Sequence, residues 1–197
     1  MDADRAPAAD GDGSWVSLEL ATVENTMALG RALGAVLQPG DLVLLTGSLG
    51  SGKTQLTKGI AAGMGVTGMV MSPTFVIARM HRPGEHGVPL VHVDAYRLSG
   101  ALELDDLDLD TDLSRAAVVV EWGEGVAEQL AQCRLIVALE RRADDTRIAR
   151  LTPVGDSWSK RLPAVLEAFR VAVAAAAAAS PNLVRTPPGR LTESGRS

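Results

Sequence analysis

The chain has 197 residues, of which 46% are hydrophobic, and its formal net charge is −5 at pH 7. This length and composition suit one sizeable core, and the negative charge argues against a wide basic surface for nucleic acid. The single cysteine excludes an intrachain disulfide framework, and we recognise no secretory signal. An apolar stretch near the length of a membrane span occurs only around the Ala-rich segment, which Arg170 bounds and whose alanines are weakly apolar. We therefore expect a cytoplasmic, single-domain protein that does not enter a membrane.

The two ends of the chain differ in composition from its middle. Residues 1–13 are rich in Ala, Asp and Gly and have no apolar period, and residues 180–197 collect prolines and scattered charges. Such segments cannot bury enough apolar surface to form a core. We expect both to be disordered tails around one domain at residues 14–179.

A strand and a helix are predicted at the start of this domain. Residues 15–20 alternate between polar and apolar side chains, as a half-buried strand does. Residues 22–37 have helical apolar spacing, and Thr22 is the expected N-cap. A Pro-Gly turn then leads into residues 41–46, a near-continuous apolar run typical of a strand covered on both faces.

A glycine-rich loop, residues 47–54 (Gly-Ser-Leu-Gly-Ser-Gly-Lys-Thr), follows that strand. Its pattern is that of loops whose backbone N–H groups bind nucleotide phosphates, with Lys53 for the β and γ phosphates and Thr54 for Mg²⁺. Residues 55–64 read as a helix, whose N-terminus favours a bound anion. A chance glycine turn is the alternative interpretation, but the strand and helix around the loop favour phosphate binding.

Two later strands end on acidic residues. Residues 90–94 end on Asp94, and residues 116–120 are followed by Glu121. The carboxyl ends of parallel strands meet at one edge of a sheet, so both acids should lie beside Lys53 and Thr54. Two acids beside a triphosphate are the setting of an Mg²⁺ ion, although each alone could simply end a strand at the surface.

The predicted fold is a three-layer α/β domain with a mainly parallel sheet around the phosphate-binding strand and helices on both faces. Residues 134–139 and 147–154 are expected to form a hairpin that adds antiparallel strands at one edge. Residues 165–179 are Ala-rich and helix-forming, but too weakly amphipathic to indicate a binding helix.

Four motifs occur in order over roughly residues 15–154. They are Gly47 to Thr54, Ser72-Pro73-Thr74-Phe75, His92-Val93-Asp94-Ala95-Tyr96-Arg97-Leu98 and Val120-Glu121-Trp122. Their residues and spacing resemble the TsaE (YjeE) family, bacterial P-loop ATPases required for the threonylcarbamoyladenosine modification of tRNA. The chain departs from the family pattern at Ser48, where an acidic residue is usual, and at Gly123, where proline is common. Neither change removes a phosphate or metal ligand.

The resemblance implies a role for each matching residue. The residues that would contact ATP are Thr22, Gly50, Ser51, Gly52, Lys53, Thr54, Gln55, Trp122 and Asp145. Catalysis would rest on Lys53, Asp94 and Glu121, and the Mg²⁺ ligands would be Thr54, Glu121 and Asp94. A buried aromatic anchor is an equally good interpretation of Trp122. Residues 72–75 would form a switch-like loop near the γ phosphate, although a plain turn is the alternative.

The function implied by the resemblance is that of an Mg²⁺-dependent ATPase. It would bind and hydrolyse ATP in complex with the proteins TsaB and TsaD and so support the N6-threonylcarbamoyladenosine modification of tRNA, which it would reach through the complex. No arginine is clearly placed as a finger, so we expect slow hydrolysis alone and acceleration by the partners. A P-loop small-molecule kinase and a nucleotide-gated binding module are the alternatives.

Overall fold

The structure is a computed structural model, which describes residues 15–68, 70–71, 77–84, 87–97, 112–125 and 127–179. The predicted tails at residues 1–13 and 180–197 lie outside the described residues, as does the predicted switch-like loop at residues 72–75.

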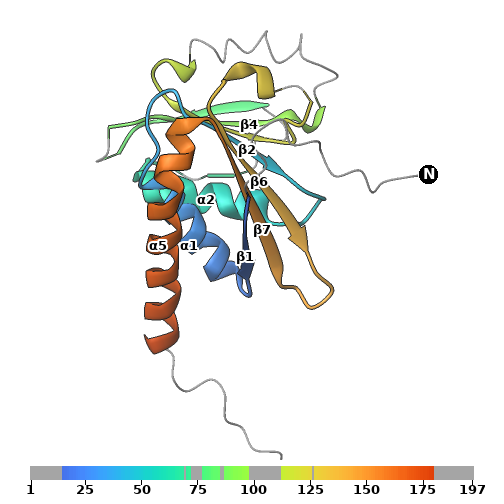
Figure 1. Cartoon of the computed structure of the whole chain (residues 1–197). Coiled ribbons are helices and arrows are strands. Elements are labelled where there is room, and N and C mark those ends of the chain that lie inside the picture. Colours follow the sequence, from blue (N-terminus) through green and yellow to red (C-terminus); the bar gives the residue numbers. More distant parts are fainter. Residues whose placement is uncertain are drawn as a thin grey trace, which may run out of the picture.

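Within the described residues, seven strands form one sheet in the order β1-β7-β6-β2-β5-β4-β3 (Figure 1). The strands are β1 Val16–Leu20, β2 Leu42–Thr46, β3 Ala78–His81, β4 Leu90–Asp94, β5 Ala117–Glu121, β6 Arg134–Arg141 and β7 Arg147–Val154. The central pairs β6-β2, β2-β5 and β5-β4 are parallel, whereas β3-β4, β6-β7 and β1-β7 are antiparallel. The predicted α/β fold with a mainly parallel sheet and antiparallel edge strands is confirmed.

The central strands β2, β4 and β5 consist mainly of Val, Leu and Ala, and every one of their residues is buried. Such apolar runs form parallel strands because both of their faces are covered. The predicted hairpin forms, but it does not make the edge of the sheet, because β1 pairs on the outer side of β7. The edge position of a strand depends on which distant segment pairs with it, and the local pattern of residues 134–154 carries no such information.

Three helices, α1 Val23–Gly34, α2 Lys53–Met64 and α5 Asp156–Ala179, lie together on one side of the sheet (Figure 1). Thr22 caps α1 as predicted, since its hydroxyl accepts a hydrogen bond from the Asn25 N–H at 3.2 Å. The helix predicted to reach residue 37 ends at Gly34, where the chain tightens into a turn held by the bond from the Leu37 N–H to the Gly34 carbonyl. A Cβ on Gly34 would lie 2.1 Å from the Ile60 carbonyl oxygen of α2, so the two helices cross in close contact.

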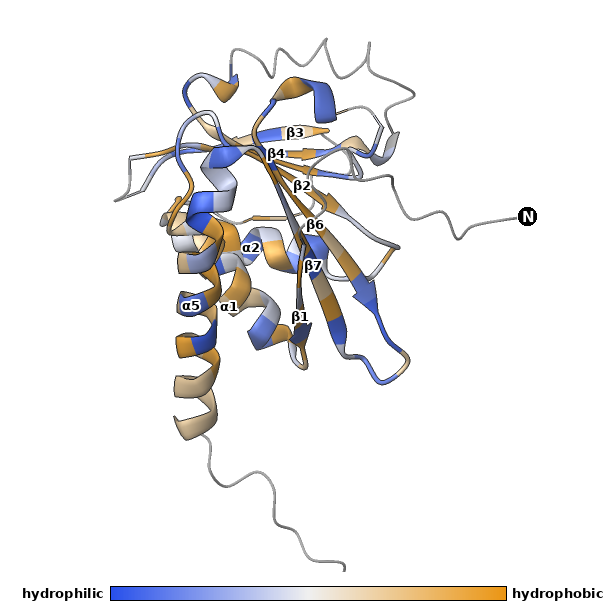
Figure 2. Ribbon diagram, viewed as in Figure 1, coloured by the Kyte–Doolittle hydropathy of each residue, from blue (hydrophilic) through white to orange (hydrophobic). Residues whose placement is uncertain are grey.

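The described residues form two apolar cores, which lie on opposite faces of the sheet. The larger one packs α1, α2 and α5 against the strands, and the smaller one includes Leu113, Ala127 and Leu130 from the segments on the other face. The central strands are correspondingly hydrophobic, whereas the far end of the β6-β7 hairpin is hydrophilic (Figure 2). Both faces of the sheet are therefore covered, as a three-layer domain requires. The prediction of helices on both faces is met only in part, because the long helices of the described residues all lie on one face and short segments cover the other.

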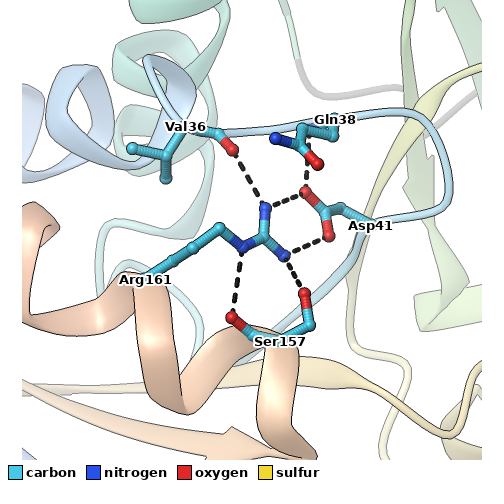
Figure 3. A network of polar contacts seen from close by, with 5 residues as sticks. All are labelled: Val36, Gln38, Asp41, Ser157 and Arg161. Carbon is cyan, nitrogen blue, oxygen red and sulfur yellow. Dashed lines mark hydrogen bonds and ion pairs between the residues drawn. The ribbon is translucent and has the colours of Figure 1, made fainter.

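The start of α5 is tied to the segment between α1 and β2 by a polar network around Arg161 (Figure 3). Its guanidinium donates to both carboxylate oxygens of Asp41, to the Val36 carbonyl and to Ser157. Asp41 also accepts a hydrogen bond from the Gln38 N–H at 2.7 Å, which closes the turn before β2.

By length and composition, α5 could cross a membrane, and 22% of its most apolar window is buried. That property is weak support for a membrane span, because core helices of soluble proteins share it. The first half of α5 packs into the larger core through Trp158, Leu162, Val165, Leu166 and Phe169.

Candidate functional site

A cleft of about 430 Å³ opens where β2, β4 and β5 end and α2 begins. Its lining residues are Val23, Leu49, Gly50, Gly52, Lys53, Thr54, Gln55, Asp94, Tyr96, Glu121, Trp122 and Arg147. Most of the residues predicted for the site are therefore brought together at one edge of the sheet, from segments that lie far apart in the sequence.

The glycine-rich loop forms the floor of this cleft between β2 and α2. Gly47, Gly50 and Gly52 have φ values of 126°, 78° and 110°, which residues with a Cβ rarely adopt. A Cβ on Gly47 would in addition lie 2.1 Å from the Leu139 carbonyl oxygen. Gly52 is the N-cap of α2 and offers no side chain to its first N–H groups. These groups and the positive end of the helix dipole are left for an anion.

The Lys53 ammonium group is folded back onto the loop. Its Nζ donates to the carbonyls of Gly47, at 2.6 Å, and Ser48, at 3.0 Å. It also lies 3.6 Å from the centre of the Trp122 ring, a cation–π distance. Burial lowers the pKa of Lys53, an effect that the nearby negative charge of Glu121 opposes. A positive group thus lies at the cleft, and its hydrogen-bond acceptors are two neutral carbonyls of the loop.

Trp122 has a backbone conformation that is unusual for its residue type. Its φ is 63°, and its N–H donates to the Leu45 carbonyl at 3.1 Å, which holds the residue beside the end of β2. Its ring meets the Tyr96 ring at a centroid distance of 5.2 Å. A large residue at positive φ is strained and is typical of functional sites. Trp122 lines the cleft, so it is not simply an aromatic anchor of the core.

Asp94 and Glu121 end neighbouring strands at the same level, because the β4-β5 register pairs these two residues. Their exposed fractions are 6% and 2%. The Glu121 Oε2 accepts a hydrogen bond from the Thr54 hydroxyl at 3.1 Å, and the Asp94 Oδ1 accepts one from the Tyr96 N–H at 3.1 Å. The arrangement places two carboxylates and a hydroxyl beside Lys53, and such hard oxygen donors match the ligand preference of Mg²⁺.

Three of the predicted site residues do not turn their side chains to the cleft. Ser51 is fully buried, and its N–H donates to the Ser48 carbonyl inside the loop. The Thr22 hydroxyl serves as the cap of α1, and the residue that lines the cleft at this point is Val23. Asp145 forms an ion pair with Arg141 in the β6-β7 turn.

Arg147 is the main residue at the cleft that sequence reasoning missed. It opens β7, and its Nη1 donates to the Asp145 carbonyl at 2.5 Å. Its Nε lies 3.9 Å from the place that a Cβ on Gly52 would occupy, so the guanidinium stands beside the loop. No signal in the sequence identifies it, because its place depends on the pairing of β6 and β7 next to β2.

Comparisons with known proteins agree with this geometry. The family described as "Threonylcarbamoyl adenosine biosynthesis protein TsaE" matches residues 20–149. A TsaE protein of Streptomyces coelicolor is 54% identical over 136 residues, which cover 66% of this chain and 92% of the relative. One from Mycobacterium tuberculosis is 59% identical over 138 residues, covering 66% of this chain and 82% of the relative.

A solved structure is also similar. The crystal structure of Bacillus subtilis YdiB superimposes with a TM-score of 0.66 at 32% identity, covering 78% of this chain and 95% of that one. The family match spans the loop, both acidic strand ends and the β6-β7 turn. The chain therefore belongs to the TsaE family of tRNA threonylcarbamoyladenosine biosynthesis proteins.

Proposed function

We propose that this chain is an Mg²⁺-dependent ATPase that supports the N6-threonylcarbamoyladenosine modification of tRNA in complex with the transferase proteins TsaB and TsaD. The observation that carries the proposal is the meeting of Lys53, Thr54 and Glu121 in one cleft at the start of α2. Membership of the TsaE family supports the place in tRNA modification.

Binding of ATP would use the loop and the helix that follows it. The free N–H groups at the start of α2 favour the phosphates, and Lys53 adds a positive charge. To reach a phosphate, the Lys53 Nζ has to exchange the Gly47 and Ser48 carbonyls for a charged acceptor. A phosphate oxygen carries a negative charge that a carbonyl oxygen lacks, so the ammonium is attracted more strongly to the phosphate and this exchange favours the bound state.

The residues that would hold Mg²⁺ are Thr54, Glu121 and Asp94. Among the described residues, no group of three or more His, Cys, Asp or Glu side chains is suited to a metal. A cation here thus depends on the Thr54 hydroxyl and on phosphate oxygens as well as on the acids, as Mg²⁺ in nucleotide sites commonly does. When bound, it would neutralise charge that develops on the transferred phosphoryl group.

Hydrolysis needs a water molecule aligned with the γ phosphate, and Asp94 or Glu121 would orient it. Lys53 and the loop N–H groups would stabilise the charge that develops. We propose that turnover is slow until a partner covers the cleft. The rim supports this, because Leu49 is 90% exposed and Tyr96 66% exposed, a surface that a partner protein would bury.

The test is ATP hydrolysis by the purified protein, alone and with TsaB, TsaD and tRNA. Lys53→Ala should abolish turnover, whereas Lys58→Ala, a change of a lysine further along α2, should not. Stimulation by the partners that depends on Lys53 supports the proposal. If the rate of hydrolysis is the same with and without the partners, the small-molecule kinase becomes the better alternative. A metabolite screen for phosphoryl transfer would then test it. Normal tRNA modification with Glu121→Ala would favour the nucleotide-gated binding module.

We further propose that the protein acts in the cytoplasm and reaches tRNA through its partners. The net charge of −5 supports an indirect contact, because a broad phosphate-binding surface needs an excess of Lys and Arg. The single cysteine is in keeping with a reducing compartment.

A further inference from the structure

A buried polar group lies beneath the cleft and connects β4, β5 and α2. It consists of His92, Glu121 and Thr57, whose exposed fractions are 0%, 2% and 0%. His92 does not line the cleft, so a ligand bound there would not touch it. Its imidazole Nε2 lies 2.8 Å from the Glu121 Oε1. The direct side-chain contact of His92 with a residue of the cleft is the one with Glu121.

The two carboxylate oxygens of Glu121 face different surroundings. Oε2 faces Thr54, a residue of the cleft, at 3.1 Å, whereas Oε1 is turned inward to His92. The Thr57 hydroxyl lies 3.4 Å from Oε1 and 3.1 Å from the Lys53 carbonyl, and it has only one proton to donate. Because the carbonyl is the nearer acceptor, His92 is the main donor that fixes Oε1.

The hydrogen bond also determines which ring nitrogen of His92 carries the proton. A carboxylate can only accept, so Nε2 must be the donor. Nδ1 is buried and has no hydrogen-bond partner within the described part of the chain. A proton there would be a buried donor without an acceptor, which is costly. The neutral ring with its proton on Nε2 satisfies this arrangement, and its N–H holds the Glu121 Oε1 in place.

We infer that His92 is a positioning residue that fixes the Glu121 carboxylate and so sets the affinity of the nucleotide site for its divalent cation. This inference rests on the proposed Mg²⁺-dependent function. A carboxylate held on one oxygen loses little conformational freedom when its other oxygen binds a metal. Groups that orient metal ligands in this way typically contribute about 10- to 100-fold to metal affinity.

The test compares ATP binding with excess EDTA and across a Mg²⁺ titration, measured by calorimetry. His92→Leu removes the donor at similar size, and His92→Gln carries an amide N–H that can take the place of the Nε2 donor. We expect His92→Leu to raise the half-saturating Mg²⁺ concentration about 10- to 100-fold. The affinity of His92→Leu for ATP in excess EDTA should equal that of the wild type. His92→Gln should recover most of the Mg²⁺ affinity that His92→Leu loses.

His81→Leu is the matched control. His81 is a buried histidine on the neighbouring strand β3, and its Nε2 has no hydrogen-bond partner among the described residues. This variant should keep the Mg²⁺ dependence of the wild type. A His92→Leu variant with wild-type Mg²⁺ dependence would overturn the inference, and so would a His92→Gln variant as impaired as His92→Leu.

Two further measurements distinguish a folding defect of His92→Leu, and a failure of the proposed function, from a failure of the inference about His92. If His92→Leu does not fold, the comparison passes to His92→Gln and His92→Asn, because the shorter Asn amide cannot reach Oε1. Equal Mg²⁺ affinity in these two variants would refute the positioning role. If the wild type binds ATP equally well with and without Mg²⁺, the proposed Mg²⁺-dependent function is wrong, and that result does not depend on any His92 variant.

Discussion

Replacing Arg161 by methionine should destabilise the protein strongly without weakening nucleotide binding by the folded fraction. The Arg161 Nη1 lies 2.6 Å from the Asp41 Oδ2, and its Nη2 lies 2.5 Å from the Oδ1 (Figure 3). The two side chains are only 18% and 10% exposed. Methionine retains much of the apolar length of arginine, so the change removes the charge and its donors and leaves the Asp41 carboxylate buried without its partner.

The expected cost follows from that burial. Removing one partner of a buried ion pair costs about 3–5 kcal/mol, whereas exposed pairs contribute about 0.2–1 kcal/mol. Asp41 keeps its bond from the Gln38 N–H, at 2.7 Å, and some solvent contact. We therefore expect the free energy of unfolding to fall by about 3 kcal/mol, the lower end of this range. At about 2–4 °C per kcal/mol for a chain of this size, the Tm should fall by roughly 6–12 °C.

The assay is thermal and urea unfolding of the wild type, Arg161→Met, Asp41→Asn and the double variant. The double-mutant cycle should give a coupling energy of about 2 kcal/mol, since the two groups contact each other directly. Arg170→Met is the control, because its contact with Glu167 on the same helix is 3.8 Å long and both side chains are more than half exposed. A loss below about 1 kcal/mol for Arg161→Met would refute the reasoning, because it would equal that of an exposed pair.

Other variants test the helix contact, the cap and the cleft. Gly59→Ala should lower the Tm, measured by calorimetry, because its Cβ would lie 2.6 Å from a backbone oxygen of α1. Thr22→Ala should cost about 1 kcal/mol in urea unfolding through loss of the α1 cap, and a loss near zero would contradict that role. Arg147→Met should weaken ATP binding in calorimetry, whereas Arg142→Met, on the same hairpin but outside the cleft lining, should not. Trp122 fluorescence should change when ATP draws the lysine ammonium from its ring; an unchanged spectrum at saturating ATP would contradict this.

Local sequence was sufficient where a few consecutive residues carry the whole signal. The strand, loop and helix from residue 42 to residue 64 were predicted because an apolar run, fixed glycines and a helical period follow one another directly. The Thr22 cap and the strand Leu90–Asp94 are recognisable for the same reason. Parallel pairing then explains why Asp94 and Glu121 were expected at one edge of the sheet, where the structure has them.

The sequence by itself therefore determined the α/β class, the phosphate-type loop and the acidic strand ends. Only the tertiary structure decided which distant side chains meet: Arg161 with Asp41 across 120 positions, and His92 with Glu121 across 29. It also decided that α1 ends at Gly34, against α2, and that Arg147 stands beside the loop. Helical and strand periods depend on neighbouring residues, whereas these contacts depend on strand order and helix crossing, which the packing of the whole chain sets.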